Sequence, residues 1–515
     1  MSKPKTFRPW NPEQTLLLPP SPVEWLPEQH LVFFLLDLIA DLDLSAIVAV
    51  YEQRDPRGVK AYDPRMMVVL LLYAYCVGIP SSRRIERACW EDAAFRVLTG
   101  NQQPDHSRIS DFRRVHLDAL TGLFVQVLRL CQKAGLVNLG TVALDGTKIK
   151  ANASKHKAMS HKRMLKAEAQ LEEEIAALLR KAELIDAQED QRYGKSKRGD
   201  ELPKELRRRQ DRIQVLRKAK AELEAEAAAD HARQRERKAR CAERQAAEAQ
   251  ASANEATAQA EAAKIRANAA RRARAARQRA EAAKALALQK AEAAGQPIPD
   301  LEPQIDPQAM PSRNLPTNAA GEAKGKAQRN FTDPDSHILK GGDGWIQGYN
   351  CQMAVDGAHQ VIVAVGISNQ ASDTPHLLPM LERILSNTGQ LPDKLLADAG
   401  YCSTDTIEGC EQRQLDAYIS TGRQRHGKRP RPSRGPAPRD LDARGRMDRK
   451  IRSKAGQAIY ALRKIIAEPV FGQIKAARGL DRFLLRGTEK TFGELNLMAI
   501  THNLLKLHRA ALNPA

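Results

Sequence analysis

The stretch Thr141–Lys155, TVALDGTKIKANASK, decides the fold class, because β-branched and aliphatic residues form a short apolar run that then turns polar. This pattern predicts a strand, with Asp145 emerging near its carboxyl end. A second short run, KLLAD, ends at Asp398, where Ala-Gly-Tyr stops it in the same local setting. Because α/β sheets place their ligands at the carboxyl ends of neighbouring strands, we expect the two carboxylates to converge.

The chain after residue 330 surrounds these runs with further strands and helices. Residues 348–356 and 359–366 are predicted strands that meet at Asp356-Gly357, a strong hairpin signal. Helical spacing and apolar runs predict one more strand at 417–421 and helices at 374–385, 402–413, 455–475 and 492–507. The predicted fold class is therefore α+β or α/β, with a mixed sheet flanked by helices.

Residues 1–140 are predicted to be compact and mostly helical. Closely spaced aliphatic residues indicate two buried helices at 31–44 and 64–77, and chain breaks separate them from two shorter helices. Ser81 or Ser82 is the expected N-cap of the first short helix, and Ser107 that of the second. Arginines on these helices resemble those of a helix-turn-helix-like DNA-binding unit, at Arg83, Arg84, Arg87, Arg108, Arg113 and Arg114. The alternative is a helical bundle with ordinary solvated arginines.

Residues 156–330 differ in kind from the rest of the chain. Aliphatic residues recur with the spacing of a heptad seam, at Leu171, Ile175, Leu178, Ala182 and Ile185, and again at Leu206, Ile213, Leu216 and Leu223. A polar break between the two runs predicts a coiled-coil-like helical hairpin, which continues into an alanine-rich charged helix. Residues 296–330 are rich in Pro, Gly, Asn and Gln and are predicted as linker. Three roles stay open for this arm: gripping DNA, gripping a second subunit, or acting as a structural spacer.

The amino-acid composition indicates which class of molecule the protein binds. The 515 residues include 82 Lys and Arg against 62 Asp and Glu, and the net charge of +20 favours a nucleic acid. Residues 422–454 contribute 13 basic against 3 acidic residues and are predicted as a flexible basic loop. No apolar run is long enough to span a bilayer and the first residues lack a signal core, so we expect a cytoplasmic protein. Seven cysteines without metal-finger spacing argue against a disulfide scaffold or a structural zinc site.

A third acid, Glu468, lies in a predicted helix among basic residues at Arg463, Lys464 and Lys475. Three converging carboxylates can hold two Mg²⁺ ions, one beside the attacking oxygen and one beside the leaving oxygen of a phosphodiester. The nearby basic residues are candidates for phosphate contacts, together with Arg478 and Arg482, and solvated surface charge is the alternative. A turn or cap role is the alternative for each aspartate.

Several motifs, in order along the chain, resemble those of the DDE transposases of bacterial insertion sequences. They are TVALDGTKIKANAS (141–154), GYNCQMAVD (348–356), LLADAGYCS (395–403) and RKIIAEPVFGQIKAARGLDRFLLRG (463–487), with a long N-terminal stretch over 62–114. The resemblance implies an RNase H-like fold and divalent-metal chemistry that cuts and joins DNA at inverted-repeat ends. It also implies that Asp145, Asp398 and Glu468 are the catalytic, metal-binding acids, with two Mg²⁺ or Mn²⁺ ions per site.

The region around the third acid departs from the family in one respect. Related transposases often carry a Tyr-x2-Arg-x3-Glu-x6-Lys signature there. Glu468 and Lys475 keep its spacing, whereas Tyr460 and Arg463 each lie one position early. The roles of Tyr460 and Arg463 are therefore left open.

The sequence thus predicts a transposase organised as a DNA-binding domain (1–140), a first catalytic strand (141–155), an inserted arm and linker (156–330) and the rest of the catalytic domain (331–515). Its expected partners are double-stranded DNA, as terminal inverted repeats and as target, and a second copy of the chain in a homodimer or larger assembly on DNA. No membrane and no small-molecule cofactor are expected, and the DNA-bound protein is expected at the nucleoid. Two alternatives stay open: a catalytically inactive DNA-binding relative, and a nuclease that cuts without joining.

Overall fold

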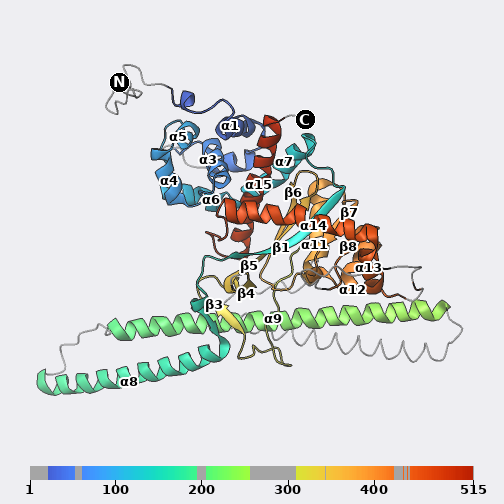
Figure 1. Ribbon diagram of the computed structural model, residues 1–515. Coiled ribbons are helices and arrows are strands. Elements are labelled where there is room, and N and C mark those ends of the chain that lie inside the picture. The colour runs from blue at the N-terminus through green and yellow to red at the C-terminus, as the bar shows by residue number, and fades with distance from the viewer. Residues whose placement is uncertain are drawn as a thin grey trace, which may run out of the picture.

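The computed structural model describes residues 21–52, 61–193, 204–255, 309–342, 344–422 and 441–513, with Ser433 and Pro438 (Figure 1). Its N-terminal region is helical, as predicted, with α1 (Leu31–Asp41), α2 (Ser45–Glu52), α3 (Pro64–Cys76), α4 (Ser82–Glu91), α5 (Ala93–Leu98), α6 (His106–Val115) and α7 (Leu117–Lys133). No helix in the described part of the chain is both long and apolar enough to cross a membrane.

A mixed sheet forms the centre of the rest of the molecule. Its strands are β1 (Thr141–Lys150), β4 (His337–Gly341), β5 (Gly344–Asp356), β6 (Ile362–Ser368), β7 (Lys394–Ala397) and β8 (Asp416–Ile419). β5 pairs antiparallel with β1, β4 and β6, whereas β7 runs parallel to β1 and β8 parallel to β7. The order β6-β5-β1-β7-β8 is that of an RNase H-like sheet, so the predicted fold class is confirmed.

Helices flank this sheet: α11 (Leu377–Thr388), α12 (Thr404–Gln412), α13 (Ala443–Arg452), α14 (Lys454–Gly472) and α15 (Thr488–Leu512). α14 packs against β1, while α11 and α15 pack against β6. Glycine at Gly389 ends α11 in the left-handed region, with φ of 84°, where a side chain is disfavoured. The predicted strands and helices of this region are therefore present, with shifts of a few residues at their ends.

The two edges of β1 are paired over different lengths. On one edge β1 pairs with β5 from Val142 to Lys150. On the other edge it pairs with β7 only from Thr141 to Leu144. Asp145 therefore lies in the middle of a long strand, not near its carboxyl end as predicted, because β5 keeps the chain extended beyond it. Between Leu144 and Lys150, no described strand pairs with the β7-side edge.

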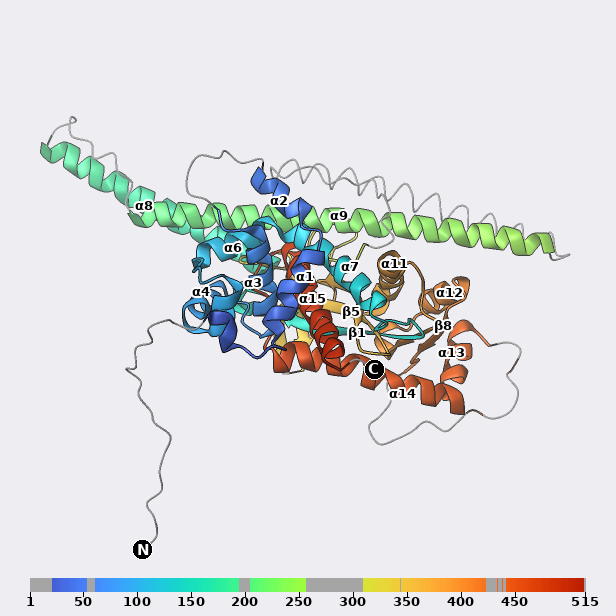
Figure 2. The same ribbon diagram turned by 90° about the horizontal axis from the view of Figure 1, so that it is seen from above.

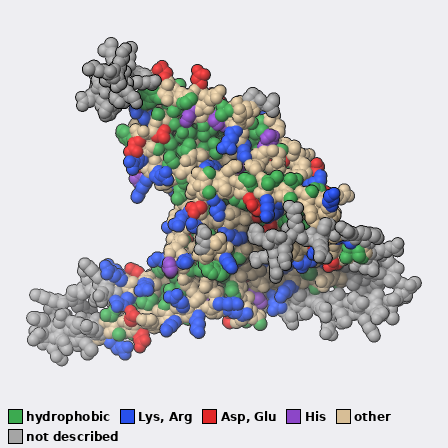
Figure 3. All heavy atoms as spheres, in the orientation of Figure 1, with side chains coloured by type: hydrophobic (Ala, Val, Ile, Leu, Met, Phe, Trp, Pro, Cys, Tyr) green, Lys and Arg blue, Asp and Glu red, His purple; other side chains and the backbone are tan. Residues whose placement is uncertain are grey.

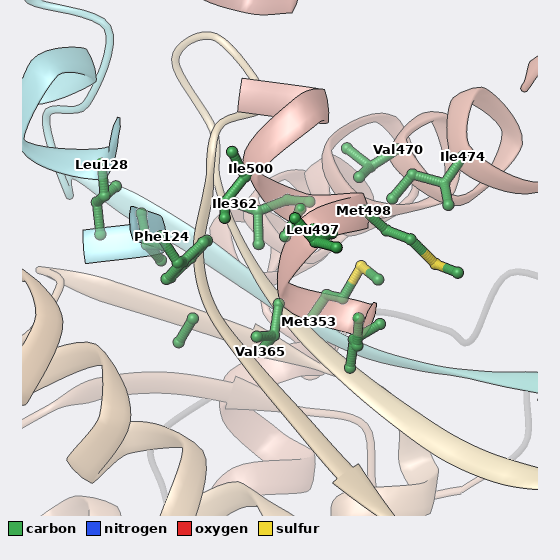
Figure 4. Packing of buried hydrophobic residues seen from close by; sticks show 14 of the residues in the cluster. Phe124, Leu128, Met353, Ile362, Val365, Val470, Ile474, Leu497, Met498 and Ile500 are labelled. Atoms are coloured by element: carbon green, nitrogen blue, oxygen red, sulfur yellow. The ribbon is translucent and has the colours of Figure 1, made fainter. Parts of the chain in front are cut away.

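One hydrophobic core runs through the N-terminal helices and the sheet, and α15 lies at its centre. α15 packs against α3, α7 and β6. Figure 4 shows Leu497 of α15 near Ile362 of β6, with Phe124 of α7 on the other side of the β6 ribbon. Gly493 permits the close approach of α15 to α7, because a Cβ there would stand 2.3 Å from the Leu117 side chain.

A buried polar network ties α15 to the N-terminal helices. The fully buried Glu494 carboxylate accepts hydrogen bonds from the Leu485 N–H and the Tyr75 hydroxyl, both at 3.1 Å. Arg113 donates to the same Tyr75 hydroxyl at 3.1 Å and to the Pro80 carbonyl at 2.9 Å. Burial raises the pKa of Glu494, while the Arg113 charge favours its ionised form. The N-terminal helices and α15 are thereby joined by a buried hydrogen-bond network as well as by apolar packing.

The arm consists of β2 (Ala158–Ser160), α8 (His161–Tyr193), α9 (Lys204–Glu255) and β3 (Gln328–Asn330), and residues 256–308 lie outside the described part of the chain. Figures 1 and 2 show α8 folding back along the first part of α9. The contact uses residues of the predicted seam, including Leu171, Ile213, Leu216 and Leu223. β2 and β3 pair antiparallel at the base of the arm.

Ion pairs attach α9 to the segment that follows it. Arg329 contacts both Glu222 and Glu226, the latter at 3.0 Å, and Arg313 lies 3.6 Å from Glu226. The Asp230 carboxylate accepts a hydrogen bond from a backbone N–H of the same segment at 2.8 Å. Residues 309–330, predicted as linker, are therefore packed against α9, because their arginines meet carboxylates there.

Two local predictions were wrong. The N-cap of α6 is Asp105, whose carboxylate accepts hydrogen bonds from the N–H groups of Ser107 and Arg108 at 2.9 and 3.1 Å, so Ser107 is not the cap. Helix α13 occupies part of the predicted basic loop, because its Met447 and Ile451 side chains are buried. Residues 423–432, 434–437 and 439–440 of that loop lie outside the described residues.

We expect Arg113→Met to lower the free energy of unfolding by about 3 kcal/mol, because it leaves the buried Glu494 carboxylate without that charge. Denaturant unfolding followed by circular dichroism measures the change. Arg114→Met is the matched control, since Arg114 is the next residue of α6 but is exposed and pairs with Asp111 at the surface; it should cost less than about 1 kcal/mol. Equal losses in the two variants would contradict the role of the network.

Candidate active site

Asp145 and Asp398 come together because β1 and β7 run parallel. Leu144 pairs with Ala397, and the residue that follows each of them is an aspartate. β7 ends at Ala397, and the Asp398 carboxylate then accepts a hydrogen bond from the Gly400 N–H at 2.8 Å, which fixes the turn that carries it. The structure thus places these two predicted acids next to each other, on β1 and directly after β7.

Burial dominates the electrostatics of this pair. It raises the pKa of the Asp145 carboxyl to about 6; the Arg463 guanidinium opposes the rise, and the Asp398 carboxylate adds to it. Burial also raises the pKa of Asp398, against the hydrogen bond from Gly400 and the charge of Arg463. Both carboxylates thus lie in a setting that disfavours their negative charge, so a cation beside them is favoured.

Arg463 connects the first acid to the third. Both Arg463 and Glu468 lie on α14. The Arg463 Nη1 donates to Asp145 Oδ2 at 2.8 Å, and its Nη2 lies 3.7 Å from Glu468 Oε1. The Arg463 side chain is only 13% exposed, whereas that of Glu468 is 55% exposed. We call Asp145, Asp398, Glu468 and Arg463 the acid centre. Arg463, predicted as a DNA contact, lies inside this centre.

The end of α14 is held against β1. Pro469 lies inside the helix directly after Glu468, and the helix then widens into a π-helical turn over 473–477. This turn carries Lys475, whose Nζ donates to Thr147 Oγ1 at 3.2 Å and to the Lys148 carbonyl at 3.1 Å. Lys475 is thereby held on the strand that carries Asp145.

The donor chemistry of the acid centre fits a hard divalent cation, because Asp145, Asp398 and Glu468 offer carboxylate oxygens. Within the described residues, no three Asp, Glu, His or Cys side chains lie close enough together to hold an ion as they stand. The guanidinium of Arg463 contacts Asp145 and approaches Glu468. Arg463 thus lies between the first and the third acid.

A polar network beside the acid centre was not predicted. Asp373 Oδ1 accepts hydrogen bonds from Asn350 at 2.7 Å and Gln352 at 2.9 Å, and the Lys148 Nζ lies 3.4 Å away. The Tyr401 hydroxyl donates to Gln352 Oε1. Asn350, Gln352 and Tyr401 are fully buried. These three residues lie within the motifs GYNCQMAVD and LLADAGYCS, and that position is the sequence signal that could have identified them. The only sequence signal for Asp373 is its position before a predicted helix.

The predicted DNA contacts fall into exposed and buried groups. Most are exposed: Arg83, Arg84 and Arg87 on α4, Arg108 and Arg114 on α6, Lys464 on α14 and Arg482 after it. Figure 3 shows Lys and Arg side chains near α4 and along the arm. Some of the exposed arginines already pair with a neighbouring acid, as Arg87 does with Glu91 at 2.9 Å. Lys475 and Arg463 are partly buried.

Arg113 and Arg478 are corrections to that set. Arg113 is 3% exposed and belongs to the Glu494 network, and Arg478 is 9% exposed. Arg478 donates to Thr501 Oγ1 at 2.8 Å and to the Met498 carbonyl at 3.2 Å. Because both guanidinium groups are used inside the core, neither is presented to a DNA backbone in this structure.

Two family models match parts of the chain. Residues 321–504 match a family model described as a transposase DDE domain, and residues 21–115 match one described as a transposase domain (DUF772). The first match contains Asp398 and Glu468, the second contains α4 and α6, and Asp145 lies outside both. No curated protein and no solved structure matches the chain significantly.

The acid centre should make folding less favourable as the pH rises. The pKa values of Asp145 and Asp398 are higher in the folded chain than in the unfolded chain, so the folded state binds protons more tightly and stability falls as the pH rises. For Asp145, whose pKa is about 6, the fall lies between about pH 4 and about pH 6. We expect Asp398→Asn to raise the free energy of unfolding at neutral pH without metal, and to have less effect in acid, where the wild-type carboxyl is protonated in both the folded and the unfolded chain.

Denaturant unfolding with a chelator present, repeated across this pH range, measures the effect. Asp393→Asn is the matched control, because Asp393 is exposed just before the other end of β7. A gain of equal size in both variants, or one that does not depend on pH, would contradict the assignment of the charge cost to the acid centre.

Proposed function

Because this chain is a DDE transposase of the insertion-sequence type, we propose that it catalyses metal-dependent cleavage of DNA at the ends of its element and the transfer of the freed strand to target DNA. The observation that carries this proposal is the parallel pairing of β1 with β7, which sets Asp145 beside Asp398. Glu468 faces the same site through Arg463. Neighbouring carboxylates on adjoining strands, next to a basic helix, suit phosphodiester chemistry.

Asp145, Asp398 and Glu468 are the proposed ligands of Mg²⁺ or Mn²⁺, with two ions in each site. When bound, these ions supply activation of the attacking oxygen and stabilisation of the leaving oxygen. The same centre would serve both steps, first with water and then with the freed 3′-hydroxyl as the attacking group. Positioning and charge neutralisation supply most of the catalysis in reactions of this kind.

The protein's own side chains orient the site and neutralise its charge. Arg463 holds the Asp145 carboxylate in place through its 2.8 Å contact. The exposed Lys464 and Arg482 are proposed contacts for DNA phosphates near the acids, and Lys475 holds the end of α14 on β1. If Arg463 gives up Asp145 when an ion arrives, its charge becomes free to pair with a phosphate.

The exposed arginines of α4 and α6 are the proposed contacts with the terminal repeats. The core that includes α15 would hold these helices at a fixed distance from the acid centre. Joining two element ends requires two active sites near each other, so we propose a homodimer or a larger assembly on DNA, acting at the nucleoid.

The purified protein with Mg²⁺ or Mn²⁺ should nick DNA that carries the terminal repeats of its element, at the repeat boundary. Asp398→Asn should lose at least about 100-fold in rate, because it removes a ligand charge from the acid centre. Gel analysis of end-labelled DNA measures nicking and joining separately. Asp393→Asn, at the other end of β7, should keep the wild-type rate.

Other results of this assay would favour the alternatives. Repeat-specific binding without nicking under either metal would identify a catalytically inactive DNA-binding relative. Nicking that is never followed by joining to target DNA would identify a nuclease.

Replacing Arg83 and Arg84 together with glutamine should weaken binding to repeat DNA and reduce its salt dependence. If each arginine contacts one phosphate, the slope of log K against log salt should fall by about 2. Fluorescence anisotropy over a salt series measures both quantities. Arg129→Gln on α7 is the control, since Arg129 is exposed but outside the proposed contact set; an unchanged slope in the α4 variant would remove α4 from the DNA-binding surface.

A further inference from the structure

Asp373 approaches the edge of β1 from the side of the sheet opposite to Arg463. Successive side chains of a strand point to opposite faces, so Asp145 and the next residue, Gly146, face different ways. Asp145 meets Arg463 on one face. On the other face, a Cβ on Gly146 would stand 3.0 Å from Asp373 Oδ1. The absence of a side chain at Gly146 therefore leaves room for the Asp373 carboxylate beside the first acid.

The same carboxylate also lies beside the second acid. A Cβ on Gly400 would stand 3.0 Å from Asp398 Oδ1 and 3.3 Å from Asp373 Oδ2. Two aspartates thus border one glycine, and a larger residue would displace both. The Thr374 hydroxyl donates to the Gly400 carbonyl at 2.9 Å, which holds the turn carrying Asp398 against the segment carrying Asp373.

The two oxygens of Asp373 have different surroundings. Oδ1 accepts hydrogen bonds from Asn350 and Gln352 and lies near the Lys148 ammonium. Oδ2 is the oxygen that faces Gly400, the residue whose N–H donates to Asp398 Oδ1. Asn350 and Gln352 are fully buried polar side chains, which are costly to bury unless they are hydrogen-bonded. Their hydrogen bonds hold Oδ1 of Asp373 in place and thereby orient Oδ2 toward Gly400.

An ordinary capping role does not account for Asp373. It occupies the N-cap position of the short 3₁₀ turn Thr374–His376, yet its side chain makes no capping hydrogen bond there. Its charge instead acts on the two acids, because it helps to raise the pKa of Asp145 and of Asp398. The Asp373 carboxylate therefore adds negative charge to the site and does not cap the 3₁₀ turn.

We propose that Asp373 is a positioning residue of the acid centre, which strengthens binding of a divalent cation by Asp145 and Asp398 from the opposite face of the sheet. The inference rests on the proposed function, since it assumes a cation at those acids. Its chemistry is that of an outer carboxylate: Mg²⁺ and Mn²⁺ keep several waters when bound, and Oδ2 of Asp373 would accept hydrogen bonds from such waters.

The test is Mn²⁺ binding to the full chain, followed by the electron paramagnetic resonance signal of free Mn²⁺, without DNA and without turnover. We expect Asp373→Asn to weaken binding about 10- to 100-fold, the usual effect of losing an outer partner of a metal ligand. Asp481→Asn is the matched control, because Asp481 pairs with Lys150 of β1 as Asp373 pairs with Lys148, but at 43% exposure. It should bind Mn²⁺ as the wild type does. Asp398→Asn should abolish binding.

Wild-type affinity in Asp373→Asn, with binding abolished in Asp398→Asn, would overturn the inference and leave the proposed function standing. No Mn²⁺ binding by the wild type would overturn both. If Asp373→Asn does not fold by circular dichroism, cleavage of the wild-type backbone by Fe²⁺ and ascorbate decides the question. Cuts near residues 145, 398 and 373 would support the proposal, and cuts near 145 and 398 alone would refute it.

Discussion

The short parallel pairing between β1 and β7 is the constraint on which the site depends. It lasts only from Thr141 to Leu144 on β1, while the antiparallel partner β5 keeps β1 extended to Lys150. The strand is thus paired on one edge and open on the other at the place where Asp145 stands. Asp398, Asp373 and α14 all approach that open edge. A longer β7 would have filled the edge with backbone hydrogen bonds and left no room for carboxylates.

The local sequence pattern was sufficient to locate the residues whose positions depend on a single strand and the turn after it. Asp145 and Asp398 could be paired in advance because each follows a short apolar run, and the register of those runs decides where the next residue lies. The role of Arg463 could not be predicted, because its spacing within the helix does not say that it turns toward Asp145. Glu468 was singled out as an acid among basic residues on a predicted helix, and the resemblance then implied its catalytic role.

Long-range packing accounts for most of what the sequence did not reveal. Arg113 and Arg114 are adjacent on a helix rich in arginine, yet one is buried and the other exposed. The difference comes from Glu494, which is far away in the chain and lies on α15. Asp373 is a similar case, since its donors Asn350 and Gln352 come from β5. Composition cannot show which distant group will face a side chain.

The attachment of α9 gives the molecule a fixed length scale. The helix has 52 residues, and at 1.5 Å per residue it is a rod of about 78 Å. Its acidic residues Glu222 and Glu226 are bound to Arg329, which is a residue of β3, the strand that pairs with β2. Because α9 is held near its middle, its end lies at a fixed distance from the sheet. A partner that contacts this end is therefore held at that distance. From Glu226 to Glu255 the helix rises about 44 Å, which is the length of about 13 base pairs at 3.4 Å each.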